Sequence, residues 1–137
     1  MGGLRAKSDA AVMLAALLLL AACAADNNNQ TRQLGDYAVT VSTDPPKLEV
    51  GKAAAVTAYI GKDDEGVERC RVSFRQYMPD HQMATDHTRH IMNDLGKGFY
   101  RADGSEFSMG GDWEMEFQFN CGDGMKTIVF PYKLVWM

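Results

Sequence analysis

The chain of 137 residues contains only three cysteines, three histidines and four prolines, and it has no long apolar run. The apolar run that precedes Cys23, residues 10–22, has thirteen residues, whereas a helix that spans about 30 Å of hydrocarbon needs roughly 20. Basic side chains are a minority, with 14 Lys and Arg against 18 Asp and Glu and a formal net charge of −4. There is neither a basic stripe nor an alternation of aromatic and basic residues, which argues against nucleic acid as a partner.

Catalytic motifs are missing as well. Nucleophilic catalysis needs a Ser, Thr or Cys that is activated by a positioned base. The chain contains no Gly-x-Ser-x-Gly elbow, no His-Glu-x-x-His and no glycine loop of the length that cradles phosphate. Acidic residues are expected mostly in turns or on the solvent-exposed face of a strand, where they are simply solvated. We therefore predict that the protein is not an enzyme.

The N-terminus has the pattern of a secretion signal. Arg5 and Lys7 precede the apolar run, which ends in small residues before Cys23. Leu20-Ala21-Ala22-Cys23 resembles the lipobox of bacterial lipoproteins, which implies removal of residues 1–22 and lipidation of Cys23. Ala24, rather than Asp, follows the cysteine, which in that family favours delivery to the outer membrane in a Gram-negative host and leaves the choice between inner and outer membrane open. We expect a lipid-anchored protein of the cell envelope that faces the periplasm or the exterior.

Residues 23–35 are predicted to form a flexible tether, because the segment is polar and has almost nothing to bury. Residues 36–137 are then long enough for one domain with a modest core. No internal repeat is apparent.

The domain is predicted to be all-β. Apolar and polar side chains alternate over residues 112–121, which is typical of a strand with one buried and one solvent-exposed face. Shorter alternations occur at residues 37–41, 56–60, 70–74 and 128–136, and turn-forming segments separate them. Strands at short spacing without helical patterns predict a single antiparallel, immunoglobulin-like β-sandwich of about seven strands. Pro131 cannot donate to a ladder, so the last strand should lie at an edge or carry a bulge.

Cys70 and Cys121 remain once Cys23 is assigned to lipid, and each is in phase with the apolar face of its strand. In an exported protein the favoured interpretation is a disulfide across the core. Two separate buried thiols and a thiolate metal site are the alternatives.

Residues 72–113 carry a more specific pattern. An apolar strand is followed by Met78-Pro79, a His/Met stretch, a Gly-x-Gly-aromatic-Tyr turn over residues 96–100, and Phe107-Ser-Met-Gly-Gly-Asp-Trp113. Over most of residues 37–136 the chain resembles the YtkA-like domain, which is related to the FixH family. The resemblance implies an immunoglobulin-like sandwich outside the bacterial membrane, with a role in copper delivery or cytochrome oxidase assembly. FixH-type members have a transmembrane anchor where this chain has a lipobox, and many members have a second Met at the position of His81.

A Cu(I) site is the hypothesis that this resemblance raises. Thioether sulfur is a soft donor that suits Cu(I), and imidazole suits copper and zinc. Met78, His81 and Met83 are the candidate ligands, and Met109 is a fourth if the two motif loops meet at one end of the sandwich. The partner would be an envelope copper acceptor or an oxidase assembly protein.

Other interpretations stay open. The methionines also fit core or rim packing, and His81 lies beside Asp80 as solvated loop histidines often do. His87 and His90 would share a face only in a helix, whereas the alternation over residues 88–93 favours a strand. Trp113 is interpreted as a core anchor, with a cation-π cover over copper as the alternative. Without metal, the domain would be an interaction module whose Met-rich end contacts a protein partner.

Overall fold

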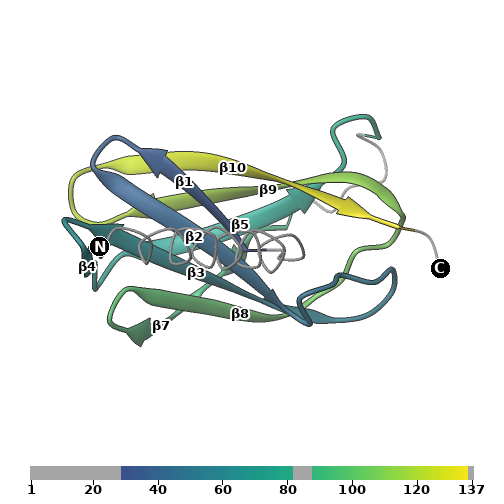
Figure 1. The fold of residues 1–137 in the computed structure, drawn as a ribbon, viewed down its shortest axis with the longest axis horizontal. Helices are drawn as coiled ribbons and strands as arrows, with labels where there is room; N and C mark the ends of the chain where they lie inside the picture. Colours follow the sequence, from purple (N-terminus) through teal and green to yellow (C-terminus); the bar gives the residue numbers. More distant parts are fainter. Residues whose placement is uncertain (1–28, 82–87, 136–137) are drawn as a thin grey trace, which may run out of the picture.

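The computed structural model describes residues 29–81 and 88–135, and within these ranges the fold is all-β (Figure 1). The strands are β1 (Gln30–Leu34), β2 (Tyr37–Asp44), β3 (Ala54–Lys62), β4 (Glu65–Gly66), β5 (Arg71–Tyr77), β6 (His90–Ile91), β7 (Asn93–Gly96), β8 (Phe99–Ser105), β9 (Gly111–Asn120) and β10 (Met125–Leu134).

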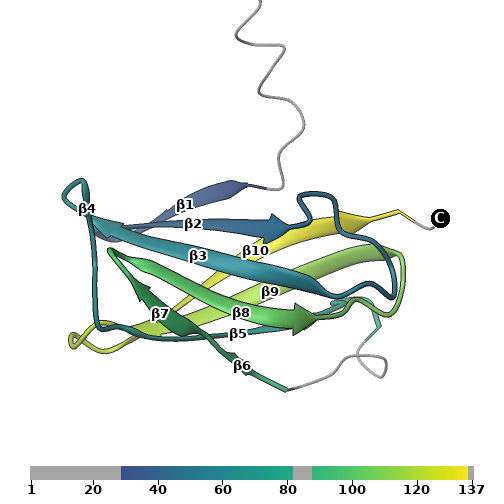
Figure 2. The same ribbon diagram turned by 90° about the horizontal axis from the view of Figure 1, so that it is seen from below.

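The strands form two antiparallel sheets that face each other (Figure 2). The larger sheet has the order β1-β2-β3-β8-β7, with β4 paired to β3, and the smaller sheet has the order β10-β9-β5-β6. Every pairing in both sheets is antiparallel. The predicted β-sandwich is therefore confirmed.

The described residues contain ten strands rather than about seven. The additional ones are short or polar: β4 and β6 have two residues each and β7 has four. A strand of that length contains too few residues to display a period of two, so its sequence carries little signal.

The tether predicted over residues 23–35 was wrong for its last part. Residues 30–34 form β1, which pairs with β2 in register from Gln30↔Val41 to Leu34↔Tyr37. All five side chains of β1 are exposed or half-buried. The strand is held by its backbone ladder rather than by an apolar face, which is why composition did not reveal it.

The core lies between the sheets, where alternating side chains of both layers meet. Along β9 the burial alternates with every residue from Trp113 to Asn120, and β2 shows the same alternation from Tyr37 onward. The largest side chains with less than 2% exposure include Tyr100, Phe74, Phe107, Phe117, Phe119 and Phe130. Burial of each aromatic side chain contributes about 1.5–3 kcal/mol, so these rings are the main source of cohesion between the layers.

Strand β10 lies at the edge of its sheet, as Pro131 predicted. Side chains of β1 bond to its outward carbonyls: Gln30 Nε2 donates to the Pro131 carbonyl over 2.6 Å, and Arg32 Nη1 donates to that of Val129. These contacts join the edges of the two sheets and cover part of the open ladder of β10.

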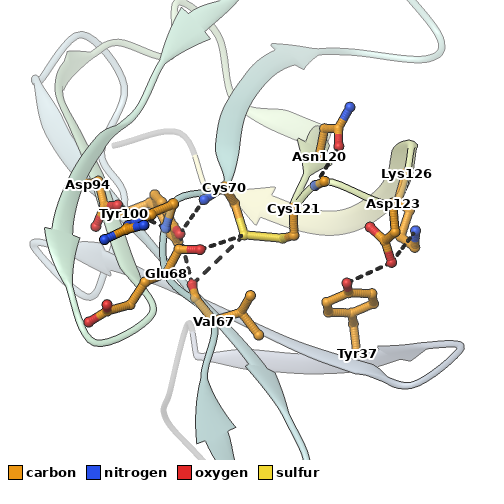
Figure 3. Close-up of a disulfide and its surroundings, with 12 residues drawn as sticks. Tyr37, Val67, Glu68, Cys70, Asp94, Tyr100, Asn120, Cys121, Asp123 and Lys126 are labelled. Carbon is orange, nitrogen blue, oxygen red and sulfur yellow. Dashed lines mark hydrogen bonds and ion pairs between the residues drawn. A yellow bond between two sulfur atoms is a disulfide. The ribbon is translucent and has the colours of Figure 1, made fainter.

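A disulfide between Cys70 and Cys121 joins the start of β5 to the β9–β10 hairpin (Figure 3). This is the pairing that the sequence favoured. Tyr100 stabilises the same region, because its hydroxyl accepts from the Cys70 amide over 2.9 Å and donates to the Val67 carbonyl over 2.8 Å. We call this part of the sandwich the disulfide end.

Candidate functional site at the methionine end

The opposite part of the sandwich is formed by loops of residues 45–53, 78–81 and 106–110, and we call it the methionine end. The loops before β3 and before β9 lie together there (Figure 1), and the Gly51 amide donates to the Phe107 carbonyl over 2.9 Å. This hydrogen bond joins the two loops.

Met78 follows the last residue of β5 and stays in phase with the buried side chains of Val72, Phe74 and Gln76. Its side chain is only 3% exposed. Directly after it the chain turns, and the His81 amide donates to the Met78 carbonyl over 3.1 Å. Pro79 occupies the second position of this turn, where its fixed φ is favourable. The turn brings the backbone of His81 back to Met78, and the His81 side chain is exposed.

Met109 lies in the loop that leads into β9. Its side chain is half-buried and packs against the core. The indole Nε1 of Trp113 donates to the Met109 carbonyl over 2.9 Å, and the edge of the Phe107 ring meets the Trp113 ring with centroids 5.2 Å apart. Trp113 thus contacts the loop at both Phe107 and Met109 and holds it against the core.

The Met78 and Met109 segments meet. A Cβ atom placed on Gly111 would lie 2.8 Å from the methyl carbon of Met78, so the thioether tip of Met78 packs on the backbone that follows Met109. Gly111 has a φ of +126°, a conformation that L side chains rarely adopt. Glycine at this position therefore permits both the backbone path and the close approach of Met78.

Gln76 makes the second connection between these segments. Its side-chain amide Nε2 donates to the Glu106 carbonyl over 2.6 Å, and the residue is 6% exposed. Gln76 was not predicted as a site residue, although its place in the sequence pattern could have indicated one. A polar side chain in phase with the dry face of a strand needs a specific partner, and Gln76 lies between Phe74 and Met78 on that face.

Three other predicted residues, Cys23, Met83 and His87, lie outside the described residues. His90 lies on β6, where its ring stacks on Phe74 with centroids 5.0 Å apart. Trp113 is 3% exposed and is a core anchor with one polar contact.

An ion-pair cluster covers the outer face of the smaller sheet. Glu116 on β9 contacts Arg75 on β5 and Arg89 just before β6, each over 3.0 Å. Arg89 also donates to the Ser73 hydroxyl over 3.2 Å. The hydrogen bond from Arg75 lowers the pKa of the Glu116 carboxyl, burial opposes this effect, and Arg89 lowers the pKa further. The cluster fixes residue 89, where the chain returns to the sheet after the 78–81 turn.

Tyr77 extends this charged face toward the methionine end. Its hydroxyl donates to Glu114 over 2.5 Å. Burial raises the pKa of Tyr77 to about 12, and the hydrogen bond to Glu114 and the negative charge of Glu114 act in the same direction. The hydroxyl therefore keeps its proton at physiological pH and acts as a hydrogen-bond donor to Glu114.

The methionine end carries two thioethers and one imidazole, together with the carboxyl groups of Glu49, Asp80 and Glu106. Among residues 29–81 and 88–135 no three His, Cys, Asp or Glu side chains are grouped as a metal site. Within the same part of the chain no helix is long and apolar enough to cross a membrane. The thioethers of Met78 and Met109 and the imidazole of His81 are donor types that suit Cu(I).

The fold and this site define the class of the protein: a two-sheet antiparallel β-sandwich with methionine-bearing loops at one end and a disulfide at the other. The family model described as YtkA-like matches residues 31–118, which is more than half of the chain, and the chain belongs to the YtkA-like family. No curated protein and no solved structure matches the chain. The matched range begins within β1, which agrees with the inclusion of that strand in the domain.

Proposed function

We propose that the protein is an envelope lipoprotein that binds Cu(I) at the methionine end and passes it to an envelope copper acceptor or an oxidase assembly protein, as a non-enzymatic, FixH-related carrier. In this proposal residues 1–22 are an export signal and the lipid on Cys23 anchors the domain to a membrane. Replacement of Cys23 by Ser is expected to release the protein from the membrane fraction.

One observation carries the metal-binding proposal. The Met78 methyl group packs on Gly111, so two methionine-bearing segments that are far apart in the sequence come together, and His81 follows Met78 by one turn. A thioether carries no charge and binds a soft monovalent ion well, whereas it is a weak ligand for hard divalent ions. The donor chemistry at this end therefore favours Cu(I).

The three proposed donors differ in their exposure to solvent. His81 is exposed and Met109 is half-buried, whereas Met78 is 3% exposed. We propose that His81 and Met109 receive the ion from solvent and that Met78 is the inner donor. Met83 stays a predicted ligand outside the described residues.

A Cu(I) competition titration against a chromophoric chelator tests this proposal. Met78→Leu and Met109→Leu remove sulfur and keep the side chain apolar and of similar volume, which usually costs less than about 1.5 kcal/mol of stability. Together with His81→Ala, each is expected to weaken Cu(I) binding roughly tenfold or more, since even the loss of an indirect contact to a metal ligand costs about 10- to 100-fold.

Two other methionines provide matched controls. Met92 is 5% exposed and Met125 is 62% exposed, and neither lies at the methionine end, so Met92→Leu and Met125→Leu should bind Cu(I) as the unchanged protein does. Equal affinity in all five variants would show that any bound copper lies elsewhere.

A second candidate function is supported by a groove beside Pro79. Its volume is about 240 Å³, and its lining includes Trp113, Pro131 and Tyr132 with the charged side chains of Asp112, Glu114 and Lys133. Aromatic residues are enriched at the centre of protein interfaces, and polar side chains form their rim. A metal-independent interaction module predicts no effect of His81→Ala on metal binding and a fully retained fold.

A further inference from the structure

Two partly buried hydrogen bonds hold the loop that carries Met109. Trp113 Nε1 donates to the Met109 carbonyl over 2.9 Å, and Gln76 Nε2 donates to the Glu106 carbonyl over 2.6 Å. The two donor residues are 3% and 6% exposed. Because the two donor side chains are buried, loss of either donor removes the protein partner of a loop carbonyl.

The two hydrogen-bond donors come from paired strands of the smaller sheet. Gln76 lies on β5 and Trp113 lies on β9, and β9 pairs with β5 through Gln76↔Met115 and Tyr77↔Glu114. Met78 lies two residues after Gln76 and is directed to the same face. The sheet that ends in Met78 therefore also sets the position of the loop that bears Met109.

We infer that Trp113 and Gln76 are positioning residues for the Met109 thioether, an inference that rests on the proposed Cu(I) function. Trp113 fixes the carbonyl of Met109 itself, and Gln76 fixes the loop three residues earlier. Fixing the backbone at both points limits the directions that the Met109 side chain takes. A donor held near its bound position loses less conformational entropy when the metal binds.

The first test is Trp113→Phe in the full chain, expressed with its N-terminal segment and purified in detergent. Phenylalanine retains a ring against Phe107 and lacks the N–H donor. Its Cu(I) affinity is expected to fall roughly 3- to 10-fold, the equivalent of one hydrogen bond. Gln76→Leu removes the other donor from an already apolar strand face and is expected to give a similar loss. Tyr37→Phe is the control, because it removes a 2.8 Å hydrogen bond to Asp123 at the disulfide end and should leave the affinity unchanged.

NMR of the Trp113 indole N–H reports whether Cu(I) binds beside the Met109 carbonyl, independently of the affinity. Addition of Cu(I) is expected to shift this resonance in the unchanged protein and to shift it less in Met109→Leu. Folded Trp113→Phe and Gln76→Leu variants that bind Cu(I) as tightly as the unchanged protein would overturn the positioning role and leave the copper proposal intact. An unchanged protein that binds no Cu(I) would overturn both.

Discussion

Replacement of Glu116 by Gln tests the ion-pair cluster on the smaller sheet. The variant keeps the shape of the side chain and removes the charge that faces Arg75 and Arg89 at 3.0 Å each. The Glu116 side chain is 16% exposed, and those of Arg75 and Arg89 are 32% and 28% exposed. Exposed pairs are worth about 0–1 kcal/mol and breaking a buried pair costs about 3–5 kcal/mol. Between these limits, we expect a loss of about 1–3 kcal/mol in the free energy of unfolding.

The sign of the pH dependence follows from the lowered pKa of Glu116. A carboxyl group with a lower pKa in the folded state contributes stability that is fully present above its unfolded pKa, about 4.3. That contribution disappears as the pH falls through the folded pKa. The difference in stability between the unchanged protein and Glu116→Gln should therefore be constant near pH 7 and shrink below about pH 4.

Urea unfolding of both proteins at several pH values measures this difference. Asp112→Asn is the control, because Asp112 and Lys133 are 4.0 Å apart and 68% and 80% exposed, so its effect should stay within about 0.5 kcal/mol. If Glu116→Gln lowered the free energy of unfolding by the same amount at pH 7 and pH 3, the stabilisation would not come from the ionised carboxylate.

Two further predictions concern the disulfide end. The double variant Cys70→Ser/Cys121→Ser should lose about 2–5 kcal/mol of stability, visible as a lower Tm that no longer responds to reductant; a Tm equal to that of the oxidised protein would contradict this. Gly66→Ala should cost about 3 kcal/mol or more, because its Cβ would clash with the Lys97 carbonyl oxygen. Gly51→Ala, with open space and a φ of +75°, should cost only about 1–2 kcal/mol; equal losses in denaturant unfolding would show that the close backbone approach is unimportant.

The sequence predicted those parts of the fold in which side-chain chemistry follows the strand period. The alternation around Phe117 identified β9, and Pro131 identified β10 as an edge. It could not predict β1, because Gln30 and Arg32 act through backbone pairing and through bonds to β10, which follows about 100 positions later in the chain. Contacts of this kind depend on the arrangement of the sheets rather than on local composition.

The candidate site was predicted in part for the same reason. Met78 and Met109 were singled out from the two motifs, but their separation in the sequence left their proximity open. The close approach of Met78 to Gly111 and the Gln76 bond to the 106–110 loop arise from the pairing of β5 with β9. The Arg75–Glu116 contact likewise follows from register, since these two residues are directly opposite in that ladder.

X-ray absorption spectroscopy of the Cu(I)-loaded protein shows which atoms bind the ion. We predict a copper environment with sulfur and nitrogen donors, with one sulfur donor fewer in Met109→Leu and one nitrogen donor fewer in His81→Ala. A copper environment without sulfur, or one that is identical in both variants, would contradict a thioether site at the methionine end.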